Sequence, residues 1–494
     1  MAKTQQQRII FGLKVRQFRQ ERGWNFDELG KRTGISPSYL NEIEKGKKYP
    51  QAENLHKLAA ALGLSPEFLA SPELTKQYAP LGTLLQSNFL DELPLDLFGI
   101  EAQQVVEIIA RAPDRVNAFI SALLEIARNY ALHNENFYFA ALRAYQELHM
   151  NYFDDIEQAA EAFVRRHQLP ETGGVPAPVL AGLLASEFRY KISENGLDAY
   201  PDLHSVRSVF NPKKRLLLLN SRLNERQRTF QLAKELGFNV LNLKQRPLAS
   251  TLTRVRAFEE VLHNYRAAYF AVALLVNRNA FVGDLRVFFE QATWKEGVLQ
   301  TLLAKYQVSP EVLFQRFNVL SLDFDLHKVF FLRFIHEVER DRFEIDKELH
   351  LNRRHQPHAS GLDEHYCRRW LSIVLLRDLH ARQSRSADET RPLIGVQRAL
   401  FADTNEEYLC LGVAKPGYPT VGRNVGVTLG ILLDERARSV IRFWDDPAIP
   451  RTVVNVTCER CSIADCSVRA APPTALQKRE ARKRMEETLK KLTG

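Results

Sequence analysis

The stretch ISPSYLNEIEKGKKYPQAENLHKLAAALGL, residues 35–64, carries the clearest structural signals in the first part of the chain. It opens with a helix start signal, because Ser36 is a preferred N-cap and Pro37 suits the first helical position, where no N–H is needed. Leu40 and Ile43 lie three residues apart on the helix that follows, so both can face inward. The stretch therefore predicts a short helix with one buried face and one polar face.

Five short helices are predicted within residues 8–70. Asn25 is a suitable N-cap for a helix over FDELGKR, and Gly34 forms the turn between this helix and the next. Two short helices joined by a tight glycine turn match the width of the DNA major groove, into which the second helix presents polar side chains. We therefore predict DNA contacts by Ser36, Ser38, Tyr39, Asn41, Glu42, Lys45 and Lys47.

The same stretch resembles the XRE-type helix-turn-helix family, and the resemblance extends over the whole small domain. It implies that Ser38 and Glu42 lie where base-edge contacts are usual, with Asn41 and Lys45 nearby. It also implies that the domain binds double-stranded DNA as a homodimer on paired half-sites. The chain departs from the family at Phe26, where a glutamine that helps to hold phosphate is common.

The composition is that of a folded protein, with 494 residues of which 45% are hydrophobic. This length suits about two to four domains. The first residues, MAKTQQQRIIFGLKVRQFRQ, have charges interrupting every apolar run, and the longest apolar stretches are far too short to span a bilayer. We therefore expect a cytoplasmic protein with no signal peptide and no membrane partner. Five cysteines in so long a chain do not indicate a disulfide framework.

The net charge of +9 is concentrated at the two ends of the chain. Residues 1–70 hold twelve Lys and Arg against seven Asp and Glu, and residues 474–494 hold seven against three. In the first block the charge coincides with the helix-turn-helix motif, which favours an attraction to phosphate. The second block is a basic helical tail, and the sequence leaves open whether it adds DNA affinity or is simply solvated.

Residues 80–170 are predicted to form a helical linker and dimerisation region. Apolar side chains repeat there at helical spacing in two runs, Val116 to Ala127 and Leu148 to Phe163. Stripes of this kind form either a core or a dimer interface. The segment ETGGVPAPVL that follows has the composition of a linker.

Residues 178–350 begin with a helix, a short strand at RLLLLN and a second helix over RTFQLAKELGFNVL. This order resembles the ImmA/IrrE family, in which the second helix carries His-Glu-x-x-His and holds a catalytic zinc ion. Here Lys234 and Phe238 stand at the two histidine positions, and only Glu235 remains. A lysine ammonium group and a phenyl ring cannot ligate zinc, so we expect a retained fold with no zinc at Glu235 and no peptidase activity.

Residues 355–473 are predicted to form a β-containing sensor domain. In NVGVTLGILLD, apolar residues from Val425 to Leu433 alternate with small or polar ones, which predicts a half-buried strand. The segment EEYLCLGVAKPG is predicted to be its antiparallel neighbour. An acyl-CoA effector would need cations for its phosphates, and Lys415 and Arg423 flank the loop between these strands. We name these two residues as candidate ligand contacts, with an ordinary turn as the alternative.

Three cysteines crowd into nine residues near the end of the chain, at Cys458, Cys461 and Cys466. Three thiolates need a fourth ligand to close a metal site, and we predict Cys367, with Asp465 or Cys410 as alternatives. An all-thiolate set suits zinc or an iron–sulfur cluster equally. Three reduced cysteines in a turn remain the other interpretation.

The stretch VTCERCSIADCSVRAAPP, together with the XRE-type head and the altered peptidase-like middle, resembles the short-chain fatty-acid regulators over nearly the whole chain. The resemblance implies a one-component transcription factor that senses an acyl-CoA or related metabolite and controls genes of carbon and fatty-acid metabolism. The alternative function is a redox or iron–sulfur sensor that uses the cysteine cluster. An enzyme with Cys410 as nucleophile would need an activating histidine, and none lies at a recognisable spacing.

The expected fold is multidomain and mainly α-helical, with an α+β C-terminal half. The expected parts are a five-helix XRE-type domain, a helical linker and dimerisation region, a zinc-less peptidase-like domain, a β-containing sensor domain and a basic helical tail. Their expected bounds are residues 1–72, 80–170, 178–350, 355–473 and 474–494.

Overall fold

A computed structural model describes most of the chain, namely residues 5–71, 134–250, 255, 257–351, 364–386, 391–417, 419–420 and 422–493. The chain divides into two compact units, one of residues 1–141 with 256–258 and one of residues 142–255 with 259–494. The predicted apolar run from Val116 to Ala127 lies outside the described residues. Among the helices that are described, none combines the length and the apolar character needed to cross a membrane.

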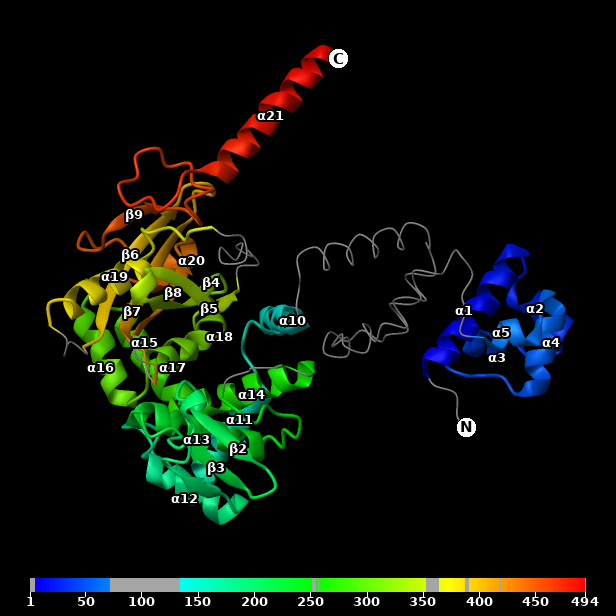
Figure 1. The fold of residues 1–494 in the computed structure, drawn as a ribbon, viewed down its shortest axis with the longest axis horizontal. Helices are drawn as coiled ribbons and strands as arrows, with labels where there is room; N and C mark the ends of the chain where they lie inside the picture. The colour runs from blue at the N-terminus through cyan, green and yellow to red at the C-terminus, as the bar shows by residue number, and fades with distance from the viewer. Residues whose placement is uncertain are drawn as a thin grey trace. The chain divides into compact units, whose positions relative to one another are not determined.

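Five helices form the N-terminal domain, as the sequence predicts (Figure 1). They are α1 (Gln5–Glu21), α2 (Phe26–Thr33), α3 (Pro37–Glu44), α4 (Ala52–Leu62) and α5 (Pro66–Ala70). The predicted cap at Asn25 is confirmed, because its side chain accepts from the N–H of Glu28 and its own N–H donates to the Glu28 carboxylate, both at 2.9 Å. Gly12 allows α1 to approach α3, because a Cβ there would lie 2.3 Å from the carbonyl oxygen of Ile43.

The second unit starts within α10 (Asn134–Leu148), which is followed by α11 (Asp154–Arg166) and α12 (Ala177–Phe188). The apolar repeat that the sequence shows from Leu148 to Phe163 is not one helix. Met150 and Asn151 have φ values of 49° and 53°, a left-handed conformation that interrupts the helix before α11 begins.

A small three-stranded sheet comes next, with strand order β1-β3-β2. Its strands are β1 (Lys191–Ser193), β2 (Ser208–Asn211) and β3 (Leu216–Leu219), and β3 is the strand predicted at RLLLLN. The predicted helices at the altered zinc motif and after it are also found, as α13 (Glu225–Val240) and α14 (Phe258–Leu275). Four further helices complete this part: α15 (Arg278–Phe289), α16 (Glu296–Tyr306), α17 (Pro310–Arg316) and α18 (Leu320–Asp323).

The C-terminal half is built on a six-stranded sheet with strand order β5-β4-β8-β7-β6-β9 (Figure 1). Its strands are β4 (Val329–Glu337), β5 (Arg342–His350), β6 (Leu393–Phe401), β7 (Glu407–Pro416), β8 (Arg423–Leu432) and β9 (Arg451–Val454). Neighbouring strands are antiparallel except β6 and β9, so the predicted antiparallel pairing of β7 with β8 is confirmed. The helices of this half are α19 (Leu371–Gln383), α20 (Glu435–Val440) and α21 (Thr474–Thr493).

Helices cover both faces of this sheet, which corrects the expectation that β8 is half buried. Every residue of β8 after its first is buried. On one face α19 lies close to the backbone, because a Cβ on Gly412 or Gly426 would come within 3.0 Å of leucine side chains of α19. On the other face α17 packs against β4 and β8. The small residues that alternate along β8 therefore make room for a helix rather than face solvent.

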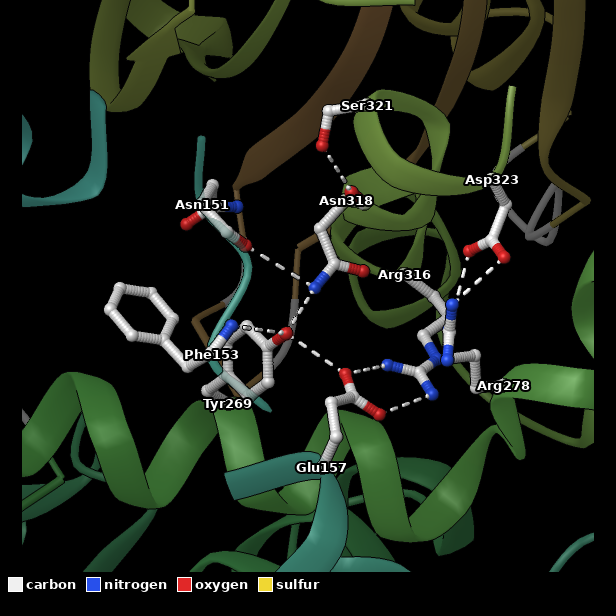
Figure 2. A network of polar contacts seen from close by, with 9 residues as sticks. All are labelled: Asn151, Phe153, Glu157, Tyr269, Arg278, Arg316, Asn318, Ser321 and Asp323. Atoms are coloured by element: carbon white, nitrogen blue, oxygen red, sulfur yellow. Dashed lines mark hydrogen bonds and ion pairs between the residues drawn. The ribbon is translucent and has the colours of Figure 1, made fainter. Parts of the chain in front are cut away.

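A buried polar network joins α11 to α14 and α17 within the second unit, as Figure 2 shows. Glu157 of α11 and Arg316 of α17 form an ion pair at 2.5 and 2.9 Å, and their side chains are only 4% and 1% exposed. Tyr269 of α14 donates to Glu157 at 2.8 Å and accepts from Asn318 at 2.7 Å. Asn318 also donates to the backbone oxygen of Asn151, so the network holds the strained joint before α11 in place.

Replacing Glu157 by Ala should lower the free energy of unfolding by about 3–5 kcal/mol, because Arg316 would be left as an unpaired buried charge. Glu161→Ala on the same helix is the matched control and should change stability by less than about 0.5 kcal/mol. Urea unfolding of both variants measures the difference, and equal stabilities would contradict the role given to the pair.

Candidate functional sites

The predicted DNA-contacting residues lie on α3 and in the turn after it. Ser38 and Lys47 are exposed, and Asn41, Glu42 and Lys45 are partly exposed. Ser36 has a structural role, since its hydroxyl oxygen accepts from the N–H of Tyr39 at 3.3 Å and caps α3. The ring of Tyr39 is half-buried, and the ammonium group of Lys48 lies 5.7 Å from its centre.

An ion pair within the domain sets the position of α3. Arg19 of α1 donates to both carboxylate oxygens of Glu44, at 2.6 and 2.9 Å, and to the carbonyl oxygen of Trp24. Burial raises the pKa of Glu44, while Arg19 opposes this shift. The guanidinium of Arg19 also lies 4.3 Å from the ring centre of Phe26. Phe26, which departs from the family pattern, thus packs on the side chain that positions α3, and sequence reasoning did not find this role.

The altered zinc motif on α13 lies in a polar network in which neighbouring side chains bind the Glu235 carboxylate. Arg246 donates to both carboxylate oxygens of Glu235, at 2.8 and 2.6 Å, and Tyr190 donates to the same carboxylate at 3.2 Å. The guanidinium of Arg246 lies 3.7 Å from the ring centre of Phe238 and 4.6 Å from that of Phe210. An internal cation therefore neutralises Glu235, and a phenyl ring fills the second histidine position.

Lys234 occupies the first histidine position and is buried, with 8% of its surface exposed. Its ammonium nitrogen donates to the side-chain oxygen of Asn264 at 2.6 Å. Burial lowers the pKa of Lys234 to about 7; Glu235 opposes this shift, and Lys347, Arg246 and Arg207 add to it. The position that binds zinc in a peptidase thus holds an amine that exchanges a proton near neutral pH.

A group of charged side chains lies on the face of the six-stranded sheet that α17 covers. Arg333 of β4 donates to Glu311 of α17 at 2.5 Å and also pairs with Asp346 of β5. Lys347 lies opposite Arg333 in the β4–β5 pairing. Lys415 lies opposite Val425, two residues from the Val427 that pairs with Arg333, so its side chain emerges on the same face.

These side chains interact electrostatically with one another and with two cations of the IrrE-like part, Arg207 and Lys234. We call the set the basic cluster, and it consists of Arg207, Lys234, Arg333, Lys347 and Lys415 with the acids Glu311 and Asp346. Desolvation by the surrounding protein lowers the pKa values of Lys347 and Lys415. Burial acts to raise the pKa of Glu311, but Arg333, Lys415 and other cations hold it well below its usual value.

Even without Lys234, whose pKa is about 7, four cations face two carboxylates in the basic cluster, so the cluster carries excess positive charge. Lys347 and Asp346 remain exposed to solvent. Glu311 attracts both Lys347 and Lys415, and Asp346 attracts Lys347, but both acids already pair with Arg333. Buried or crowded cations without counter-charges are costly, and an anionic group entering the cluster would relieve that cost.

The two predicted ligand contacts have different surroundings. Lys415 belongs to the basic cluster. Arg423 lies at the start of β8 and donates to Glu337 of β4 at 2.6 Å, so its charge is already neutralised.

The cysteines are brought together only in part. Burial raises the pKa of the Cys367 thiol, and the neighbouring thiols of Cys458 and Cys461 raise it further, so these three lie close together. Cys466 is half-buried, and no such interaction joins it to Cys367 among the described residues. Throughout the part of the chain that is described, no three His, Cys, Asp or Glu side chains are arranged to hold a metal ion.

Cys410 lies apart, on the α19 face of the sheet. Burial raises the pKa of its thiol to about 12. It lines an apolar cavity of about 20 Å³ between α19 and the sheet, together with Trp370 and Gln397. A cavity of this size holds about one water molecule, so it is too small for an acyl chain.

Comparison with known proteins identifies two of these parts. The helix-turn-helix family matches residues 15–69, and the IrrE N-terminal-like domain family matches residues 196–318. The HTH-type transcriptional regulator YazB of Bacillus subtilis is 39% identical over 64 residues, which cover 13% of this chain and 93% of YazB. The fold and these matches define a DNA-binding protein with a peptidase-like second domain. The chain belongs to the XRE family of helix-turn-helix transcriptional regulators and carries an IrrE-like domain.

Longer relatives occur in Mycobacterium tuberculosis. The HTH-type transcriptional regulator RamB is 25% identical over 246 residues, or 46% of this chain and 48% of RamB. The HTH-type transcriptional regulator PrpR is 24% identical over 245 residues, or 47% of this chain and 48% of PrpR. The matched part thus spans about half the length of each relative. A solved structure of a Mycobacterium tuberculosis transcriptional regulator covers 68% of this chain and 94% of its own, with a TM-score of 0.46 and 20% identity.

Lys234 should make stability depend on pH. Its pKa is about 7 in the folded chain and 10.5 in the reference state, so the unfolded chain binds more protons between these values and stability rises with pH there. Lys234→Met should therefore stabilise the protein more at pH 6 than at pH 9, by a difference of about 2 kcal/mol. Urea unfolding at both pH values measures this, with exposed Lys214→Met as the control. An equal gain from Lys234→Met at the two pH values would show that the amine is not desolvated.

Proposed function

We propose that this chain is a one-component transcriptional regulator of the cytoplasm that binds double-stranded DNA as a homodimer and responds to an acyl-CoA or related metabolite. The basic cluster is the observation that carries the proposal. It places excess positive charge beside the IrrE-like domain, where the zinc ligands of a peptidase are absent. An acyl-CoA carries several phosphate groups, which guanidinium and ammonium groups bind by charge-assisted hydrogen bonds.

The proposed response uses the ion pairs of Arg333. Glu311 belongs to α17 and Asp346 to β5, so both acids compete with an entering phosphate for the same guanidinium. A bound ligand therefore changes the contacts between α17 and the sheet. Such a ligand shifts DNA binding only if its affinity differs between the DNA-competent and DNA-free arrangements. We also propose that the target genes are genes of carbon and fatty-acid metabolism.

The ligand site can be tested by titrating the full chain with acetyl-CoA and propionyl-CoA in a calorimeter. Lys415→Ala should weaken binding about 10-fold or more, because it removes one charge-assisted contact to phosphate. Glu311→Gln should strengthen binding, because it removes a competing carboxylate. Arg423→Ala is the control and should leave the affinity unchanged, since Glu337 already holds Arg423.

Thermal melts establish that each of these variants is folded, and the more exposed Asp346→Asn replaces Glu311→Gln if the latter is unstable. Unchanged affinity in Lys415→Ala, or binding by neither thioester, would remove the basic cluster as the effector site.

We assign DNA reading to the exposed face of α3 and the turn after it. Asn41→Ala should reduce affinity for the preferred sequence by about 1–3 kcal/mol and relax its base preference. Lys47→Ala should weaken binding to all sequences alike and reduce the salt slope by about 1, because it removes a phosphate contact. Binding to an operator selected from random DNA, measured over a range of salt concentrations, separates the two. A uniform loss in Asn41→Ala would place base reading elsewhere.

A second candidate function is redox or metal sensing at Cys367, Cys458 and Cys461. The closeness of these three thiols favours it, since soft thiolates suit zinc or an iron–sulfur cluster. These three thiols are not arranged to hold a metal ion, so they as well as Cys466 would have to move to form a four-thiolate site. Anaerobic purification with iron, sulfide and zinc analysis tests this, and iron with sulfide that is lost in Cys458→Ser would support it. A protein with zinc alone or no metal would count against redox sensing.

A further inference from the structure

Helix α21 stands apart from the body of the second unit (Figure 1). Ala475 and Leu476 are half-buried, and the N–H of Leu476 donates to the carbonyl oxygen of Glu459 at 3.0 Å. Every residue from Gln477 to Leu492 is exposed. A helix of this length that is exposed on every side is marginal in water, and its i,i+4 ion pairs add only about 0.3–0.5 kcal/mol each.

One strip along α21 is apolar although it faces solvent. Met485, Leu489 and Leu492 are 58%, 51% and 78% exposed. They are spaced by four and three residues, the spacing that places side chains on the contact line of a two-helix coiled coil. Continuing the same repeat toward the start of the helix reaches Arg482 and Lys478.

We propose that α21 pairs antiparallel with α21 of a second copy of this chain. The apolar strip then becomes the contact line, and each copy covers the exposed side chains of the other. This inference shares with the proposed function only the requirement for two copies, and it names the element that joins them.

The charges on the strip select the antiparallel orientation. A parallel pair would place Lys478 beside Lys478 of the second copy and Arg482 beside Arg482 of the second copy, and like charges facing each other destabilise a coiled coil. In an antiparallel pair with Arg482 opposite Met485 of the second copy, Lys478 lies opposite Leu489 of the second copy. The aliphatic stems of these cations can cover apolar side chains while their charged ends reach water.

The residues that flank the strip also fit this orientation. In the same register Arg479 lies beside Glu486 of the second copy, and the contact occurs twice because the pair is two-fold symmetric. The parallel orientation brings no such opposite charges together. A DNA backbone would engage the cations of α21 but leave Met485, Leu489 and Leu492 exposed, so a second copy covers the helix better than a nucleic acid does.

Chemical crosslinking of the full chain tests the pairing even where other regions also hold two copies together. Arg479→Cys with Glu486→Cys places two thiols seven residues apart beside the proposed contact line. Glu480→Cys with Glu487→Cys is the matched control, with the same spacing on the opposite face of α21. A short bismaleimide should crosslink the first double variant into dimers several-fold more than the control or the unaltered chain. Adding Leu489→Lys to the first double variant should abolish this difference.

Equal crosslinking of the two double variants, or a difference that survives Leu489→Lys, would overturn the antiparallel pairing. Sedimentation of the unaltered chain separates this failure from that of the proposed homodimer, because a dimer without the crosslink would be joined elsewhere. Higher DNA affinity in Leu489→Lys with unchanged crosslinking would assign α21 to DNA and also overturn the pairing.

Discussion

The ion pairs of Arg333 connect the two halves of the second unit. Arg333 lies on β4 in the six-stranded sheet, Glu311 comes from α17, and Asp346 comes from β5. Arg333 is buried, and Glu311 pairs with it away from solvent, so removing Glu311 would leave charge uncompensated in a place where water cannot replace the acid. The strand register places Lys347 and Lys415 on the same face of the sheet as Arg333. The face on which α17 packs therefore also holds the excess positive charge.

The N-terminal domain could be predicted almost completely, because local signals specify it. Asn25, Ser36 and the glycines after α2 and α3 set the helix ends by hydrogen bonds and backbone geometry within a few residues. The loss of the zinc ligands could likewise be seen at Lys234 and Phe238. The role of Phe26 could not, because its partner Arg19 comes from another helix and forms part of a buried ion pair with Glu44.

Of the residues of the basic cluster, only Lys415 could be predicted from the sequence as a ligand contact. The other members of the cluster come from the residue before β2 and from α13, α17, β4 and β5, which are far apart in the sequence, so only the tertiary fold brings them together. One signal was present, since Arg333 interrupts the apolar run VFFLRFIHE, where a charge needs a partner. The half-buried strand expected at β8 was wrong for a related reason. Alternating small residues also occur where a helix packs closely on a sheet, and Gly412 and Gly426 show that α19 does so.

We propose two linked properties for the chain, DNA binding at α3 and occupation of the basic cluster by an anionic thioester. The most direct test measures the affinity of the full chain for its selected operator across a titration with propionyl-CoA and acetyl-CoA. We expect a change of about 5-fold or more with at least one thioester, equivalent to a coupling free energy of about 1 kcal/mol or more, and we expect Lys415→Ala to abolish it. The same operator affinity at every concentration of both ligands would contradict it.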